Sequence, residues 1–247
     1  MAANIMICNL KNPGFESETQ LVQAIVSYAK RTYRRGYNVE LEVDAGVGVA
    51  DVVLAKRAPH STKALKSLGG VTPRLAILLS QEIGGSITNR SALAASLGTS
   101  ESAAQRVLLK LSVAGVARRS GVEVNIRTIK APPFESIIAV EAKIRDWQRV
   151  LIQAYRNLQF ADESWVVLDH ACIRPALLHK DRFERAGVGL ASMSRVGELV
   201  IHSNAARQGP VSPAKRWQAQ AVLASRVLMR RVHQGPDFKI ASKEMAQ

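Results

Sequence analysis

Residues 137–144, with the sequence IIAVEAKI, place two charged side chains in an otherwise apolar run of strand length. Glu141 and Lys143 are two residues apart, and because side chains alternate along a strand, both point to the same face. Charges at the end of so apolar a strand are costly unless they are paired or bind a metal. We therefore expect residues 136–144 to form a strand that carries a functional pair at its end.

A second carboxylate stands upstream, at the start of another apolar run. Asp51 precedes Val-Val-Leu within residues 50–55, and residues 39–43 alternate apolar and acidic side chains before a turn with two glycines. This pattern predicts two strands joined by that turn. If the strand of Asp51 pairs with the strand of Glu141, both carboxylates meet at one sheet edge. Two carboxylates and a backbone carbonyl are oxygen ligands that suit Mg²⁺ or Mn²⁺.

An ordinary salt bridge between Glu141 and Lys143 is the alternative, because such pairs are common at protein surfaces. The order of the elements favours the functional interpretation. Residues 17–35 carry a helical apolar stripe, residues 146–160 form a second amphipathic helix, and residues 165–168 form a further strand. Without the intervening segment, the order is helix, three strands, helix, strand.

The middle of the chain has a different pattern. Residues 58–72 contain Pro, Ser and Gly and predict a linker, and residues 73–130 predict three short helices followed by a β-hairpin. Helices and a hairpin in this order are typical of a winged helix-turn-helix. Residues 131–210 then return to the pattern of residues 1–57. We expect a discontinuous α/β core interrupted by an inserted α+β domain, with a further hairpin over residues 187–204.

Positive charge is concentrated in two segments. The chain has a formal net charge of +14, to which residues 73–130 and 211–247 contribute +5 each. Such a surplus favours a polyanion as partner, because each neutralised phosphate releases condensed counterions. Nucleic acid is the first expectation and an anionic membrane surface the second. Residues 211–247 predict a basic helix and tail, whose Lys and Arg residues track phosphates or form a solvated face.

The sequence favours a reducing cytoplasm, which we expect to be prokaryotic, with a plasmid or phage context. Cys8 and Cys172 are too few for a disulfide scaffold or a thiolate-rich zinc site. Residues 1–10 lack the basic segment and long apolar run of an export signal, and we expect no membrane span. The histidines form no close pair in the sequence, so His170 and His202 are interpreted as structural.

Two short segments carry a resemblance to a known family. Residues 42–54, EVDAGVGVADVVL, followed by residues 140–143, VEAK, resemble the PD-(D/E)XK nuclease superfamily. The resemblance covers roughly residues 17–56 and 134–170, and it implies a restriction-endonuclease-like αβββαβ core. Ala50 stands where the motif has proline, a difference that leaves the ligand chemistry intact.

The resemblance implies roles for five side chains. Asp51 and Glu141 would hold Mg²⁺ or Mn²⁺, and Lys143 would orient the attacking water or stabilise the developing phosphorane charge. Similar nucleases often present a glutamine from the next helix, here Gln153, and an acidic residue from the first helix, here Glu18. An exposed helical glutamine and an acidic residue that merely favours a helix N-terminus are the alternatives for these two.

The predicted winged helix offers its own candidate residues. The second helix of a helix-turn-helix lies in the major groove, and here it is expected over residues 100–113. Arg118 and Arg119, near the hairpin tip, would touch backbone or minor groove. A protein-docking role for the module is the alternative. The exposed set on the second helix, of which Arg106 is the strongest candidate, is Ser100, Glu101, Ser102, Gln105, Arg106 and Lys110.

These patterns together predict a divalent-metal-dependent DNA endonuclease, a deoxyribonuclease whose winged helix binds duplex DNA and whose core hydrolyses phosphodiester bonds. We expect a homodimer, because a double-strand cut from single active sites usually requires two copies, or a larger protein–DNA assembly. The alternative from a different class is a DNA-binding regulator or complex subunit with a catalytically inactive nuclease-like scaffold. An RNA-directed nuclease is less favoured, because winged helices suit duplex grooves better than single strands.

Overall fold

The computed structural model describes residues 13–33, 36–80, 87–121, 123–127, 129 and 131–233. The chain divides into two compact units. Unit 1 consists of Met1–Arg57 and Glu135–Arg216, and unit 2 consists of Ala58–Phe134 and Trp217–Gln247. Unit 1 is therefore discontinuous in sequence. In the described part of the chain, no helix combines the length and the apolar character needed to cross a bilayer.

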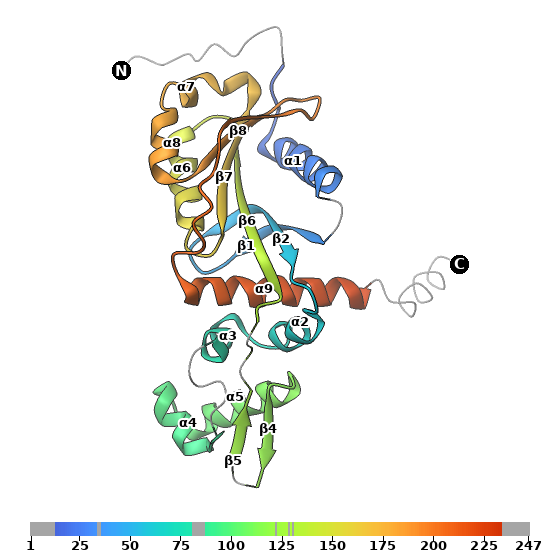
Figure 1. Ribbon diagram of the computed structural model, residues 1–247, viewed down its shortest axis with the longest axis vertical. Coiled ribbons are helices and arrows are strands. Elements are labelled where there is room, and N and C mark those ends of the chain that lie inside the picture. Colours follow the sequence, from blue (N-terminus) through green and yellow to red (C-terminus); the bar gives the residue numbers. More distant parts are fainter. Residues whose placement is uncertain are drawn as a thin grey trace, which may run out of the picture. The chain divides into compact units, whose positions relative to one another are not determined.

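Unit 1 is a six-stranded mixed sheet with helices on both faces (Figure 1). The elements, in chain order, are α1 (Glu18–Thr32), β1 (Tyr37–Asp44), β2 (Val49–Arg57), β6 (Phe134–Lys143), α6 (Trp147–Asn157), β7 (Glu163–Asp169), the 3₁₀ helix η1 (His170–Cys172), α7 (Arg174–Leu177), α8 (Lys180–Ala186), β8 (Gly189–Met193) and β9 (Leu199–Ser203). The strand order is β1-β2-β6-β7-β8-β9. Strands β6, β7 and β8 are parallel, whereas β1 with β2 and β8 with β9 are antiparallel.

The core of unit 1 has two layers, one on each face of the sheet. On one face, Leu21 and Ile25 of α1 pack in the same cluster as Val140 of β6. On the other face, Val150 of α6 packs with Val166 of β7. Figure 1 shows α1 on one side of the sheet and α6 and α8 on the other. The long apolar run predicted to form a strand is β6, which is buried on both faces as inner strands of parallel sheets are.

The predicted elements of the core occur in the predicted order. The expected pairing between the strand of Asp51 and the strand of Glu141 is confirmed, because β2 and β6 are neighbours in the sheet. The hairpin predicted over residues 187–204 is confirmed as β8 and β9. Residues 170–186, for which the sequence analysis predicted no element, form η1, α7 and α8. They supply the crossover that a parallel connection from β7 to β8 requires.

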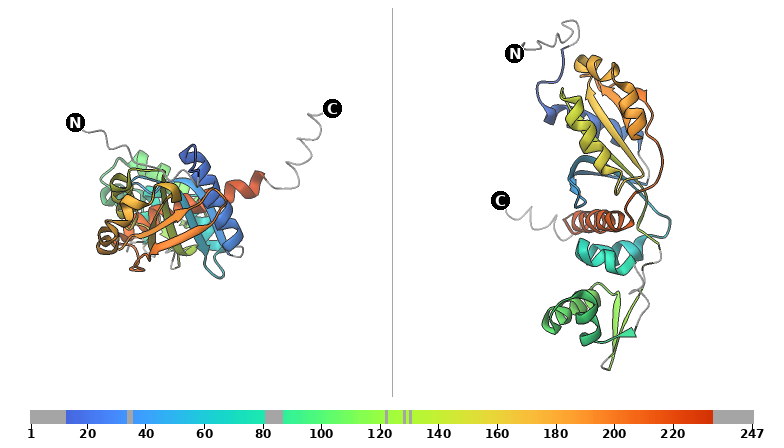
Figure 2. Two further views of the ribbon diagram at one scale, coloured as in Figure 1. Left: turned by 90° about the horizontal axis from the view of Figure 1, so that it is seen from above. Right: turned by 90° about the vertical axis from the view of Figure 1, so that its left-hand side faces the viewer.

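Unit 2 contains a small sheet and several short helices. Its elements are α2 (Thr62–Gly69), α3 (Pro73–Ser80), β3 (Ile87–Thr88), α4 (Arg90–Leu97), α5 (Glu101–Val113), β4 (Ala117–Ser120), β5 (Glu123–Ile126) and the greater part of α9 (Pro213–His233), within which the two units divide. The three-stranded sheet has the order β3-β5-β4, and its pairs are antiparallel. Helices α4 and α5 gather on one side of this sheet (Figure 2).

The segment predicted to be a linker, residues 58–72, is instead part of the packed unit. Its helix α2 buries Leu65 and Leu68 completely. At Gly69 a Cβ would lie 3.0 Å from the backbone oxygen of Ala224, so α2 and α9 approach closely at this point. The sequence analysis placed the C-terminal helix in a segment of its own, whereas residues from Trp217 onward group with residues 58–134. The spacing of two leucines is too short a signal to distinguish a packed helix from a linker.

Candidate functional site

Asp51 and Glu141 lie on neighbouring strands at the centre of the unit 1 sheet. The backbone N–H of Ala142 donates a hydrogen bond of 2.8 Å to Asp51 Oδ2, which ties the carboxylate of β2 directly to β6. This bond fixes the side chain of Asp51 beside the strand that carries Glu141. The structure therefore brings together the two carboxylates that lie ninety residues apart in the sequence.

Glu141 is the most deeply buried acidic group of the site, with 2% of its surface exposed. Burial raises the pKa of this carboxyl from 4.5 to about 7, and the negative charge of Asp51 adds to the increase. A hydrogen bond of 2.7 Å from Asn157 Nδ2 to Glu141 Oε1 and the charge of Lys143 act in the opposite direction. The ionised side chain is thus held at an electrostatic cost that a bound cation would relieve.

The pKa of Asp51 is also raised, by a balance of opposing effects. Burial raises the pKa of its carboxyl, the Ala142 hydrogen bond and the charge of Lys143 lower it, and the charge of Glu18 raises it again. Two acidic groups with raised pKa values beside a lysine are a pattern enriched at functional sites.

Lys143 forms its ion pair with Glu18 of α1, at 2.6 Å between Nζ and Oε2. The ordinary salt bridge considered between Lys143 and Glu141 is therefore not the pair that forms. With 23% of its side chain exposed, Lys143 is partly shielded from solvent. The first helix thus brings Glu18 into contact with Lys143.

Helix α6 contributes two amide side chains, one of which the sequence analysis missed. Asn157 is buried and donates to Glu141, as described above. Gln153, which was predicted as a site residue, lies one turn earlier on the same helical face. Its Oε1 is buried and has no hydrogen-bond partner among the described residues. Its burial and its 2.7 Å contact to Glu141 distinguish Asn157 from the other polar residues of the helix, and neither can be predicted from spacing alone.

A metal at this site would be held by few protein ligands. The described residues contain no group of three or more His, Cys, Asp or Glu side chains that could hold a metal ion. Mg²⁺ is commonly bound through only one or two carboxylates, with water and substrate phosphate completing its coordination. Asp51 and Glu141 fit this donor set. The buried Oε1 of Gln153, which has no hydrogen-bond partner among the described residues, is a further polar atom that a ligand could satisfy.

In unit 2, the predicted DNA-binding residues of α5 fall into different environments. Ser100 is the N-cap of α5, where its side chain accepts a hydrogen bond from Ala103 N at 3.3 Å, and its hydroxyl lies 3.0 Å from that of Ser102. Arg106 and Lys110 are exposed. The side chain of Ser100 therefore caps α5, whereas the side chains of Arg106 and Lys110 are accessible to solvent.

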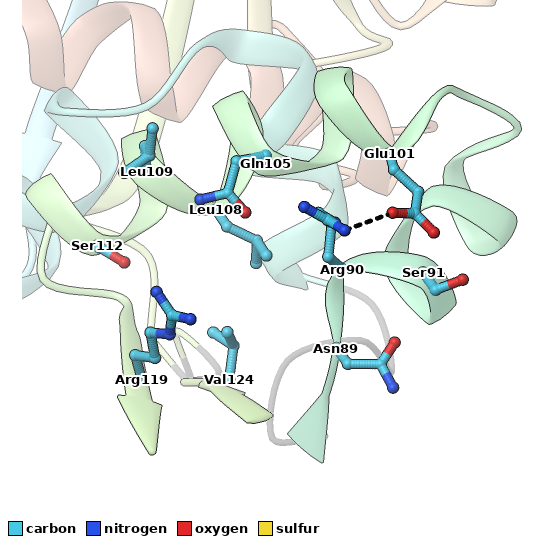
Figure 3. A pocket seen from close by; sticks show the side chains of 10 residues that line it. All are labelled: Asn89, Arg90, Ser91, Glu101, Gln105, Leu108, Leu109, Ser112, Arg119 and Val124. Carbon is cyan, nitrogen blue, oxygen red and sulfur yellow. Dashed lines mark ion pairs between the residues drawn. The ribbon is translucent and has the colours of Figure 1, made fainter. Parts of the chain in front are cut away.

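A hollow of about 420 Å³ lies between α5 and the small sheet (Figure 3). Gln105 of α5 and Arg119 of β4 line it, together with an ion pair of 2.8 Å between Arg90 and Glu101. Glu101, which the sequence analysis included among the exposed residues of α5, thus forms an ion pair with Arg90 of α4. Figure 3 shows these side chains around the hollow.

The hairpin predicted to be a wing is formed by β4 and β5. Arg118 and Arg119 are exposed on β4. Arg119 Nε donates a hydrogen bond of 2.8 Å to the carbonyl of Gly121, which holds its side chain toward the turn. Gly121 has a φ of +63°, a conformation that glycine adopts without strain.

Lys215 and Arg216 of the C-terminal helix, for which the sequence left phosphate tracking and a solvated face open, have contacts within unit 1. Arg216 is mostly buried, pairs with Asp162 at 2.8 Å and donates to the carbonyl of Phe160 at 3.0 Å. Lys215 Nζ donates to the carbonyl of Gly46 at 2.9 Å. The start of the basic C-terminal helix therefore stabilises unit 1. Of the two cysteines, Cys172 is buried and Cys8 lies outside the described residues.

Comparison of the chain with protein families, with curated proteins and with solved structures gave no match.

Proposed function

We propose that the protein is a divalent-metal-dependent DNA endonuclease, in which unit 1 hydrolyses phosphodiester bonds and unit 2 binds duplex DNA. The observation that carries the proposal is the pair of carboxylates from adjacent strands. Asp51 is bound to the strand of Glu141, and its charge raises the pKa of that buried carboxyl. Two like charges held together in a partly buried place gain stability from a shared cation.

Each side chain of the site has a task in this proposal. Asp51 and Glu141 each use one carboxylate oxygen in a hydrogen bond to the protein, so the other oxygen of each is the one that would meet Mg²⁺ or Mn²⁺. Bound there, the metal would polarise the phosphate and lower the pKa of a water molecule. Lys143 would hold a phosphate oxygen or the attacking water, and its pairing with Glu18 keeps the ammonium group oriented.

The order of elements supports the same proposal. In unit 1 the sequence α1, β1, β2, β6, α6, β7 matches the αβββαβ order of a restriction-endonuclease-like core. In unit 2, a helix, a strand, two helices and a hairpin, with the sheet order β3-β5-β4, match the arrangement of a winged helix-turn-helix. Arg106 and Lys110 of α5, together with Arg118 on β4, are the exposed basic groups through which unit 2 would contact DNA.

Purified full-length protein incubated with supercoiled plasmid tests the proposal. With Mg²⁺ or Mn²⁺ we expect nicked or linear product, and with EDTA none. Asp51→Asn, Glu141→Gln and Lys143→Ala should each reduce cleavage at least a hundredfold, a loss typical of removing one electrostatic catalytic group, while duplex affinity changes little. Glu163→Gln, which alters an acidic residue of β7 outside the site, is the matched control and should cleave like wild type.

A second candidate function is a DNA-binding regulator or complex subunit with an inactive nuclease-like scaffold. The observation that favours it is the ion pair between Lys143 and Glu18, because this pair engages the lysine without any substrate. Intact duplex binding without metal-dependent cleavage, across both metals and both plasmid topologies, would support this candidate and contradict the nuclease proposal.

A further inference from the structure

Two histidines that are far apart in the sequence share one hydroxyl group in unit 1. Ser192 Oγ lies 2.9 Å from His170 Nδ1 and 2.8 Å from His202 Nε2. Ser192 is fully buried, whereas both imidazoles are partly exposed. The sequence shows no close pair of histidines, but in the structure Ser192 of β8 joins these two into a cluster.

The hydroxyl fixes how the two rings are protonated. A serine hydroxyl has a single hydrogen, so it can donate to only one of the two ring nitrogens. The other imidazole must then donate its own N–H to Ser192 Oγ. The ring nitrogens that are not bonded to Ser192, here called the outer nitrogens, are Nε2 of His170 and Nδ1 of His202. In the neutral cluster, one outer nitrogen is a donor and the other is an acceptor. One added proton makes both outer nitrogens donors, gives the cluster a positive charge and leaves both hydrogen bonds of the buried hydroxyl intact.

The cluster lies on the same face and at the same end of the sheet as the carboxylates. Lys143 is opposite Leu168, and Leu168 is opposite Ser192, in two parallel ladders. Paired residues of a ladder share a face, and two strand spacings place Ser192 about 10 Å from the position of Lys143. Phosphates of one DNA strand follow each other about every 3.4 Å along the duplex axis. A duplex that meets the carboxylates would therefore bring a phosphate about three nucleotides further along the same strand to the histidines.

We propose that His170 and His202, bridged by Ser192, form a proton-dependent site for one backbone phosphate of bound DNA. Two N–H donors with one positive charge match two oxygens of a phosphodiester. A metal is a poorer fit, because both inner ring nitrogens are already bonded to the hydroxyl and no third His, Cys, Asp or Glu within the described residues completes a metal group with them. The identification of DNA as the source of this phosphate rests on the proposed function. The capacity of the two histidines to bind an oxyanion is independent of it.

The surroundings of His202 disfavour its protonated form. Burial lowers the pKa of His202, and the charges of His170 and of Lys180 on α8 lower it further. Glu184 of α8 pairs with Lys180 at 3.2 Å, which offsets part of that charge. The carboxylate of Asp169, next to His170, accepts hydrogen bonds from Phe15 N and Ala171 N. An oxyanion would supply the missing negative charge and draw a proton onto the cluster.

Nuclear magnetic resonance titration of the histidine rings in the full-length protein tests the site, with resonances assigned through His170→Gln and His202→Gln. Titrations are run in buffer alone, with sulfate, whose charge is constant over this pH range, and with a short duplex. We expect both rings to titrate at higher pH with sulfate and with duplex. Duplex affinity of the wild type should be about tenfold tighter at pH 5.5 than at pH 8, as for one charge-assisted contact.

His170→Gln and His202→Gln should each lose this pH dependence, whereas His60→Gln, an exposed histidine of unit 2, should retain it. If duplex binds but leaves both ring titrations unchanged while sulfate shifts them, the backbone is not the ligand and the proposal for DNA is overturned. If neither ligand shifts them, the cluster is structural. If duplex does not bind at all, the proposed function fails, and the sulfate titration alone then decides whether an oxyanion site exists.

Discussion

Glu141 combines deep burial with a position beside another carboxylate. Among the described residues, the amide of Asn157 donates a hydrogen bond to one of the two carboxylate oxygens of Glu141. Because burial raises its pKa to about 7, the folded protein holds this proton more tightly than the unfolded chain, whose carboxyl titrates near 4.5. The contribution of Glu141 to the free energy of unfolding is therefore fully present below pH 4.5 and is lost as the pH rises through about 7.

Glu141→Gln should remove this pH dependence. Without metal, we expect the variant to be more stable than wild type at pH 8, by about 3 kcal/mol at most, and similar to wild type at pH 4.5. Millimolar Mg²⁺ should stabilise the wild type at pH 8, stabilise it less at pH 5.5, and leave the variant unchanged. Urea unfolding at the three pH values, in EDTA and in Mg²⁺, measures these differences.

Asn157→Ala is the companion variant, because it removes the hydrogen bond that lowers the pKa of Glu141. The pH at which Mg²⁺ begins to stabilise the protein should then move upward. Unfolding profiles of wild type and Glu141→Gln that run parallel from pH 4.5 to 8 would contradict a strained carboxylate and leave the metal proposal without its main support.

Helix α5 has two sides with different tasks. Ala104, Leu108 and Leu111 are buried against the rest of unit 2, at the spacing of an amphipathic helix. The opposite side exposes Arg106 but also Val113, which is 90% exposed at the end of the helix. The basic side chain lies in the N-terminal half, the part of a recognition helix that meets base edges.

Arg106→Ala should weaken duplex binding by about 1 to 3 kcal/mol if the guanidinium contacts a base edge. Fluorescence anisotropy with labelled duplex, at several salt concentrations, measures the loss. Arg185→Ala, which removes an exposed arginine of α8 in unit 1, is the matched control for net charge. Equal affinities for wild type and Arg106→Ala at every salt concentration would exclude Arg106 from the interface.

The charge of the whole chain, +14, predicts strong salt dependence of DNA binding. If about six phosphates are contacted, affinity should fall about a thousandfold between 50 and 200 mM salt. Replacing both Arg118 and Arg119 by Ala should reduce the slope of log affinity against log salt by about two, because each phosphate contact contributes about 0.9. An unchanged slope in the double variant would mean that the hairpin does not touch the DNA backbone.

Long apolar runs and helical stripes were readable because burial imposes them directly on local sequence. Residues 137–143 form part of β6, and residues 17–35 contain α1, because each must present apolar side chains at a fixed period to a core. Helix α2 and the helices of the crossover from β7 to β8 could not be predicted from the sequence. Their helices are short, and such segments take their structure from packing against neighbours more than from their own periodicity.

The candidate site likewise has features that the sequence predicts and features that only the tertiary structure shows. Local sequence was enough to place Glu141 and Lys143 on one face of a strand, since the alternation of side chains is a property of the strand alone. The partner of Lys143, the contact from Asn157 and the meeting of His170 with His202 depend on which strands and helices become neighbours. Such contacts join residues remote in the chain, and their geometry exists only once the sheet has assembled and its helices have packed.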